Sequence, residues 1–160
     1  IIRVYGYAVQ TSDNLTNLNE NMAKMESNSQ KRKYLRQTEK YLKNQFEEPL
    51  KKLSRKDGQI LLKLINRQTD RTTFELVKDL KSGWSAFWNQ QAAKMFDLNL
   101  KSKYVPADVL EDFYIEMLIH ELAAEGRIEY RQPARNLKME QVKAKWKSKL
   151  GNSGYYPEEN

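Results

Sequence analysis

Apolar residues recur along most of the chain at intervals of three or four positions. This spacing places them on one face of an α-helix, with Lys, Glu and Gln residues on the other face. The pattern predicts helices at 4–25, 27–49, 54–68, 72–81, 84–96, 107–125 and 136–149. We therefore expect an all-α fold, a single compact domain of about six or seven helices over residues 1–150. Residues 127–132 fit either a connector or at most one short isolated strand or hairpin, and residues 151–160 fit a mobile tail.

Capping signals support three of the predicted helix starts. Ser27 is followed three residues later by Gln30, Ser54 by Asp57, and Thr72 by Glu75. In each pair a short polar side chain can accept a hydrogen bond from the first turn, and the acidic side chains of the last two pairs also complement the positive end of the helix. Pro49 should kink or end the second helix, because its nitrogen cannot donate a backbone hydrogen bond.

Large aromatic side chains are concentrated between residues 84 and 96. Trp84, Phe87 and Trp88 fall on one helix face, and Met95 continues the same stripe. We interpret this stripe as core rather than as a ligand platform, because burying each large ring contributes about 2–3 kcal/mol. The predicted core comprises Leu35, Leu42, Phe46, Leu61, Leu64, Ile65, Phe74, Val77, Leu80, Phe87, Trp88 and Met95.

The net charge of +7 is unevenly distributed. Residues 1–56 contain 12 basic and 6 acidic residues, whereas residues 105–134 contain 2 basic and 7 acidic ones. A basic helix at 31–56 could attract an acidic protein or a polyanion. The lysines are interspersed with glutamates, however, which favours a solvated helix face over a specific polyanion site.

The acidic residues between 108 and 129 form a block. Paired carboxylates can support glycoside hydrolysis. Without a groove to place them in, we favour the simpler interpretation that they solvate a helix beside basic neighbours. The block consists of Asp108, Glu111, Asp112, Glu116, Glu121, Glu125 and Glu129.

Few residues suit catalysis or metal binding. The chain has no Cys, which excludes a disulfide, a thiolate nucleophile and a thiolate metal site. Ser85 lacks the preceding strand and the second glycine of a nucleophile elbow. His120 and Glu116 could supply two metal ligands, but a partly buried, hydrogen-bonded histidine is the favoured interpretation. We predict no catalytic residue, no metal and no cofactor.

The central part of the chain resembles a known family. The similarity rests on "GQILLKLINRQT", "TTFELVKDLKSGWSAFW" and "NLKSKY" within residues 30–104, and on "VYGYA" at 4–8, where Gly6 replaces a proline. These segments resemble an uncharacterised family of exported Bacteroidetes proteins, a domain of unknown function. The resemblance implies export to the periplasm or cell envelope and carries no catalytic residues with it. Residues 105–160 lie largely outside the resembling pattern.

Two functions of different classes remain open. The favoured one is a non-catalytic binding or structural module of the cell envelope, with a protein or polyanionic partner. The alternative is a hydrolase-type enzyme acting on a cell-envelope polymer, which would need a cleft between the 66–72 turn and the helix start at 82–88. A concave pocket with converging Arg67, Asp70 and His120 would favour this alternative. Nucleic-acid binding is a third and less favoured hypothesis, and no segment is long and apolar enough to cross a membrane. Candidate binding residues are Asn66, Arg67, Asp70, Arg71, Trp84 and His120.

Overall fold

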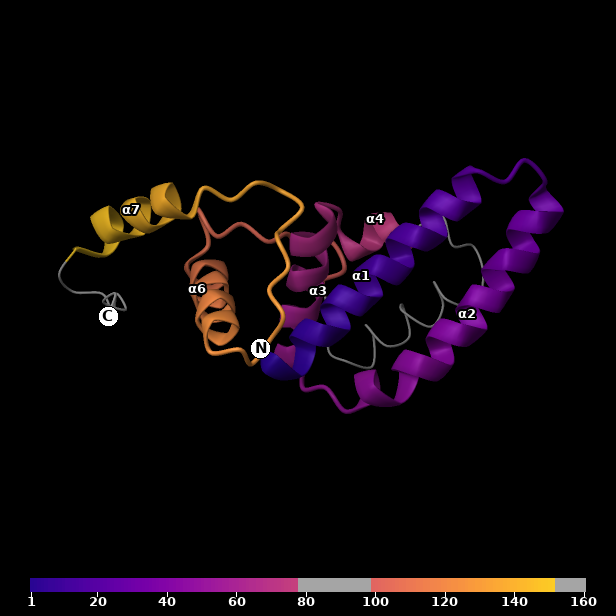
Figure 1. Cartoon of the computed structure of the whole chain (residues 1–160), viewed down its shortest axis with the longest axis horizontal. Helices are drawn as coiled ribbons and strands as arrows, with labels where there is room; N and C mark the ends of the chain where they lie inside the picture. Colours follow the sequence, from indigo (N-terminus) through magenta and orange to yellow (C-terminus); the bar gives the residue numbers. More distant parts are fainter. Residues whose placement is uncertain (78–98, 152–160) are drawn as a thin grey trace.

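Helices dominate the computed structural model of the chain, which describes residues 1–77 and 99–151 (Figure 1). No strand occurs within those two ranges, so the all-α prediction is confirmed, and residues 127–132 form an irregular connector. No helix in this part of the chain is long and apolar enough to span a bilayer. The helices are α1 (Ile2–Ala23), α2 (Asn28–Lys51), α3 (Arg55–Thr69), α4 (Thr73–Val77), α6 (Leu110–Ala124) and α7 (Met139–Leu150).

The core lies where α1 packs against α3, and α6 closes it from the other side. Leu15, Leu64 and Ile119 are fully buried there, one from each helix. Figure 1 shows α1 and α2 as antiparallel neighbours at one end of the molecule and α7 at the opposite end. A second apolar cluster joins α7 to α6, with the rings of Phe113 and Trp146 stacked 5.9 Å apart between centroids.

Helix α1 is continuous despite a polar run in its middle. Thr11 and Ser12 disfavour a helix in isolation, because their hydroxyls compete for backbone hydrogen bonds. Both are buried in the structure, on the stripe that also contains Val4, Ala8 and Leu15. The apolar contacts on this stripe therefore outweigh the local preference, as is usual for helices in a folded domain.

Two of the three predicted capping pairs are present. At the start of α2 the prediction is wrong, because Ser27 Oγ accepts from the backbone N–H of Ser29 at 3.2 Å and makes no reciprocal pair with Gln30. Ser54 Oγ accepts from the backbone N–H of Asp57 at 3.1 Å, and the Asp57 carboxylate accepts from the N–H of Ser54 at 3.3 Å. Thr72 and Glu75 make the same reciprocal pair, at 3.2 and 2.7 Å. Hydrogen bonds from the backbone and then the side chain of Thr72 lower the pKa of Glu75. The capping sequences thus mark the starts of α3 and α4 correctly.

One local prediction differs from the structure, and another is met approximately. Pro49 lies inside α2, which ends two residues later at Lys51. Its nitrogen cannot donate to the carbonyl four residues earlier, so the helix loses one backbone hydrogen bond and stops within a turn of the proline. Phe74 was expected in the core but is 41% exposed, and the Lys101 ammonium lies 4.8 Å from the centre of its ring. This cation–π contact compensates the ring for part of its lost burial.

Of the predicted core, the structure confirms five members as buried: Leu35, Leu61, Leu64, Ile65 and Val77. The side chains of Leu42, Phe46, Leu80, Phe87, Trp88 and Met95 lie outside those described, as does the aromatic stripe that includes Trp84. The tail predicted at 152–160 lies outside the described residues as well.

Substituting Leu64 by Ala should test the position of the core. Leu64 is fully buried on α3, so the change should lower the free energy of unfolding by about 2–5 kcal/mol through lost burial and a cavity. Urea denaturation followed by circular dichroism measures this loss. The control is Leu118→Ala on α6, where a side chain that is 39% exposed should matter by less than about 1 kcal/mol. Equal losses in the two variants would contradict the assigned core.

Candidate functional site

A buried ion pair joins α3 to α6. Arg67 and Glu116 have fully buried side chains and meet through two parallel hydrogen bonds, Nε to Oε2 and Nη2 to Oε1, both 2.7 Å long. The remaining terminal nitrogen, Nη1, donates to the backbone carbonyl of Arg131 at 2.8 Å. Burial would lower the pKa of Arg67, but the hydrogen bonds and charge of Glu116 outweigh it and raise that pKa. Such a two-point contact is the strongest that arginine makes with a carboxylate.

The hydroxyl of Tyr104 also donates a hydrogen bond to Glu116. This hydroxyl lies 2.9 Å from Glu116 Oε2 and 3.0 Å from the backbone carbonyl of Asp112, so its single hydrogen is directed between two acceptors. Burial first, and then the charge of Glu116, raise the pKa of Tyr104 far above its ordinary value of 10.0. The phenol is therefore a permanent donor here and not a titrating acid.

A second ion pair lies one turn along the same interface. Lys63 Nζ donates to Asp112 Oδ1 at 2.6 Å and to Glu111 at 2.7 Å, while Asp112 Oδ2 accepts from the N–H of Val105 at 2.8 Å. Burial would lower the pKa of Lys63, but the hydrogen bonds that Lys63 donates to Asp112 and Glu111 outweigh it and raise that pKa. We call Lys63, Arg67, Tyr104, Asp112 and Glu116 the polar lock.

The interpretation of the acidic block as solvated is wrong for Asp112 and Glu116, which are both fully buried. A charge pattern along one helix cannot show which charges find partners on another helix. The usable signal was the matched spacing: basic Lys63 and Arg67 are four residues apart, and so are the two acids. Two helices packed along these faces can form both pairs at once.

The structure disperses most of the predicted binding residues. Asn66 Oδ1 accepts from the backbone N–H of Tyr104 at 2.8 Å, so it supports the polar lock. Asp70 ends α3 in the left-handed conformation and pairs with Arg135 at 2.5 Å. Arg71 donates to the carbonyl of Glu75, and Trp84 lies outside the described residues.

His120 lies beside the polar lock. Its Nε2 is 3.4 Å from Glu116 Oε1, its side chain is 43% exposed, and its ring centre is 4.9 Å from that of Tyr130. Arg67 and His120 thus both face Glu116, whereas Asp70 pairs on the surface. The three side chains therefore do not converge, and residues 82–88, which would form the other side of the expected cleft, lie outside the described residues. Across residues 1–77 and 99–151, no group of three or more His, Asp or Glu side chains is arranged to hold a metal ion.

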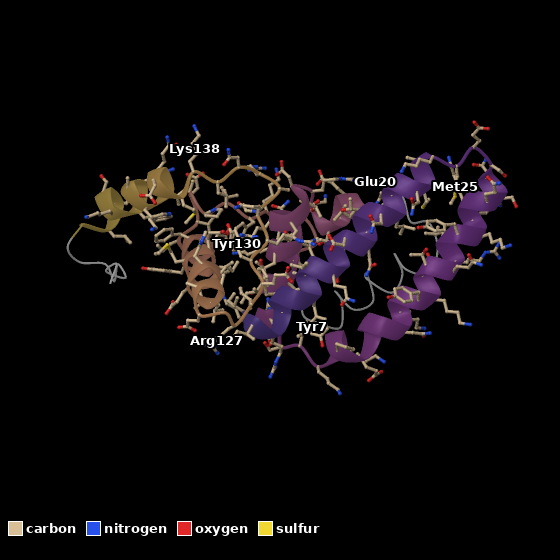
Figure 2. The ribbon with its side chains drawn as sticks, viewed as in Figure 1. Tyr7, Glu20, Met25, Arg127, Tyr130 and Lys138 are labelled. Atoms are coloured by element: carbon tan, nitrogen blue, oxygen red, sulfur yellow. The ribbon has the colours of Figure 1, made fainter. Side chains whose placement is uncertain are left out.

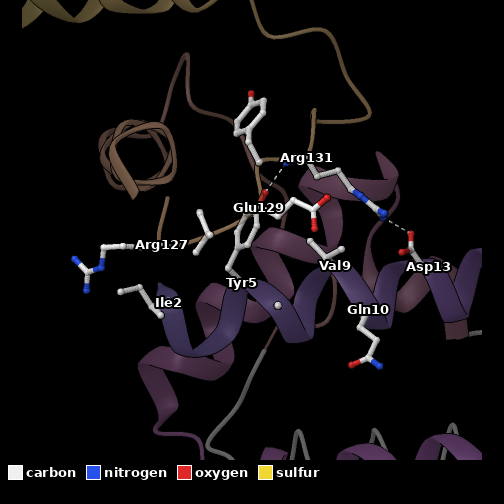
Figure 3. Close-up of a pocket in the computed structure, with 11 residues that line it drawn as sticks. Ile2, Tyr5, Val9, Gln10, Asp13, Arg127, Glu129 and Arg131 are labelled. Atoms are coloured by element: carbon white, nitrogen blue, oxygen red, sulfur yellow. Dashed lines mark hydrogen bonds and ion pairs between the residues drawn. The ribbon is translucent and has the colours of Figure 1, made fainter. Parts of the chain in front are cut away.

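A groove of about 540 Å³ lies directly beside the polar lock. One wall is a single face of α1, and the other is the connector 127–131 (Figure 3). We call it the α1 groove. Its apolar surface comes from Ile2, Tyr5, Val9 and Ile128, and its charged residues are Asp13, Arg127, Glu129 and Arg131.

Two contacts hold the connector against α1, and a third holds it against α3. The backbone N–H of Arg131 donates to the hydroxyl of Tyr5 at 3.0 Å, and its guanidinium pairs with Asp13 at 2.5 Å (Figure 3). Its carbonyl accepts from Arg67, as described above. Sequence reasoning missed the groove, because residues 127–131 carry no periodic pattern and their position is set by these distant partners.

Gly6 opens the middle of the groove. It sits among the groove residues of α1, and a Cβ at this position would meet no atom within 4 Å. Glycine inside a helix costs about 1 kcal/mol relative to alanine. Because space is available for a side chain, packing does not explain this glycine, and its effect is to leave the groove unobstructed.

Glu116→Gln should reveal the polar lock as a stability determinant. The amide keeps the shape of the side chain but leaves the Arg67 charge buried without a counter-charge, which should lower the free energy of unfolding by about 3–5 kcal/mol. Urea unfolding provides the measurement. Glu125→Gln breaks only the exposed contact with Arg127 and should change it by less than about 1 kcal/mol. A small effect at both sites would contradict a buried ion pair.

Tyr104 should make stability fall at alkaline pH. In the unfolded chain its phenol ionises near pH 10, whereas in the folded chain the raised pKa keeps it protonated. Its stabilising contribution is therefore complete below pH 10 and declines above it by up to about 1.4 kcal/mol per pH unit. The difference in unfolding free energy between wild type and Tyr104→Phe should shrink between pH 9 and 11. The exposed Tyr41→Phe is the control, and a difference independent of pH would contradict the assignment.

Comparison with known proteins places the chain in a family without a known activity. No curated protein sequence and no solved structure matches it at a significant level. One family model does match, described as a domain of unknown function (DUF4294), and it covers residues 1–121. This range is wider than the resemblance noted at 30–104, and it includes all five residues of the polar lock. The chain therefore belongs to the DUF4294 family.

Proposed function

We propose that the chain is a non-catalytic binding module that holds an extended segment of a protein partner in the α1 groove. The observation that carries this proposal is the groove itself, a concave surface of about 540 Å³ whose walls combine apolar and charged side chains, built on a helix and an anchored connector. Pockets of this size and composition are typical binding sites. The buried charges beneath it are satisfied by one another, which suits support of a surface rather than chemistry.

The dimensions of the groove favour a short peptide. Its lining on α1 runs from Ile2 to Asp13, about 16 Å at 1.5 Å per residue. About five residues of an extended chain cover that length. Among the described residues, no hydrogen bond uses the backbone N–H or C=O of Ile128 or Glu129. These groups are available to an added extended segment, which is a common mode of peptide recognition.

The charges of the groove argue against a polyanion at this place. Arg127 and Arg131 are balanced by Asp13 and Glu129. A polyanion would gain no net attraction there, whereas an apolar peptide side chain would gain contact with Val9 and Ile128. The protein partner is therefore the better of the two partner classes predicted from the sequence.

Helix α2 supplies long-range attraction in this proposal. Its basic side chains follow one stripe along the helix and are exposed to solvent: Arg32, Lys33, Arg36, Lys40 and Lys43. Glu39 lies among these residues, but the face is basic on balance, and a net positive face raises the rate at which an acidic partner arrives. We therefore expect the bound segment to belong to an acidic protein. For the location of the protein we retain the proposal of the bacterial cell envelope, which the family resemblance supports.

Gly6→Leu should block binding without harming the fold. The new side chain enters open space and improves helix propensity by about 0.8–1.0 kcal/mol, but it fills the groove. A peptide selected from a random seven-residue phage library against the wild type serves as probe. Its Kd, measured by fluorescence anisotropy, should rise at least about tenfold for Gly6→Leu, equivalent to about 1.4 kcal/mol.

Asn17→Leu is the matched control, because it adds the same group to an exposed position of α1 beyond the groove. It should leave the Kd unchanged. The proposal fails if the library yields no binding peptide, or if Gly6→Leu and Asn17→Leu bind the selected peptide as the wild type does. Steep weakening by salt in every variant would instead indicate a polyanion-type contact through α2.

A further inference from the structure

A second pocket, of about 510 Å³, lies beside the start of α7, at the end of the molecule opposite α2 (Figure 1). It is formed between residues 104–108, which precede α6, and residues 135–145, which lead into α7. Part of its lining is apolar and buried. Tyr104 and Val142 are 5% and 6% exposed, and Trp146 Nε1 donates to the carbonyl of Pro106 at 2.7 Å. We call it the α7 pocket.

The α7 pocket is basic, in contrast to the balanced α1 groove. Arg135, Lys138 and Lys145 line it, and Asp108 is its one carboxylate. Lys138 immediately precedes α7 and Lys145 lies on that helix, and both side chains line the pocket. Figure 2 shows Lys138 at the outer edge of the molecule, where α7 begins.

The ion pairs that these cations form are exposed and can be replaced by contacts with a ligand. Lys145 contacts Asp108 at 2.6 Å and Arg135 contacts Asp70 at 2.5 Å, in both cases between side chains that are more than a third exposed. Exposed pairs contribute at most about 1 kcal/mol, so an incoming anion can compete for them. No carboxylate of the described residues forms an ion pair with Lys138.

We propose that the α7 pocket binds a small organic molecule through its oxyanion group, a phosphate or sulfate. The cations at the rim and the amides of Asn136 and Gln141 offer donors to the oxyanion. The volume far exceeds that of a bare ion, and the apolar lining of Val105, Ala107 and Leu137 suits the organic part. This proposal is independent of the α1 groove, with which the pocket shares no lining residue.

Amide NMR shifts at low salt test this proposal, with glucose 6-phosphate as the probe. We expect saturable shifts at Ala107, Lys138 and Gln141, and none with glucose. Lys138→Gln should weaken binding about tenfold, the effect of losing about 1.4 kcal/mol of charge-assisted contact. Lys147→Gln is the matched control, since it removes the same charge from an exposed position on the opposite face of α7.

Two further arms identify the source of the oxyanion. Inorganic phosphate tests the ion alone, and vesicles containing phosphatidylglycerol test a lipid headgroup by co-sedimentation. Vesicle binding that Lys138→Gln weakens and Lys147→Gln does not would assign the phosphate to a lipid. Equal losses in the two lysine variants, or no binding of any probe, would overturn the proposal. Gly6→Leu must leave this binding intact, so failure at the α1 groove remains a separate result.

Discussion

The contact between Arg67 and Glu116 is the constraint on which the rest of the structure depends. It fixes α6 against α3, and the third nitrogen of the guanidinium holds the carbonyl of Arg131. The backbone N–H of Ala134 in turn donates to the carbonyl of Arg67 at 2.9 Å. One buried arginine therefore positions a connector more than sixty residues away, and with it one wall of the α1 groove.

Charge in a core is costly, so its presence calls for a physical reason. An apolar pair of similar volume is often at least as stabilising as a buried ion pair. What a buried ion pair adds is a defined register between the two helices. Because Lys63 and Arg67 face Asp112 and Glu116 in sequence along the helices, sliding α6 by one turn would leave a charge in the core without a partner. Apolar side chains such as Leu64 and Ile119 would tolerate that slide far better, which makes the polar lock a determinant of alignment more than of cohesion.

The sequence predicts the helices well and their mutual contacts poorly. Periodicity and the Ser54 and Thr72 caps depend on neighbours within four residues, so they can be recognised in one dimension. The burial of Glu116 depends on a partner 49 residues away. The position of the connector 127–131 has even less basis in the local sequence, because Tyr5 and Asp13, near the start of the chain, hold it in place. His120 lies beside Glu116, as its spacing on the helix predicts. It was expected to be partly buried, but its side chain is 43% exposed.

The family match ends at residue 121, inside α6, whereas the acceptor of the arginine's third nitrogen stands at residue 131. A recombinant fragment that ends at residue 121 would retain all five side chains of the polar lock. It would lack the carbonyl of Arg131, so Nη1 of Arg67 would lose its acceptor and Tyr5 would lose its contact with the connector. Cutting after residue 134 would keep that electrostatic unit whole. The boundary best suited to a shortened fragment of this protein thus lies beyond the end of the family match.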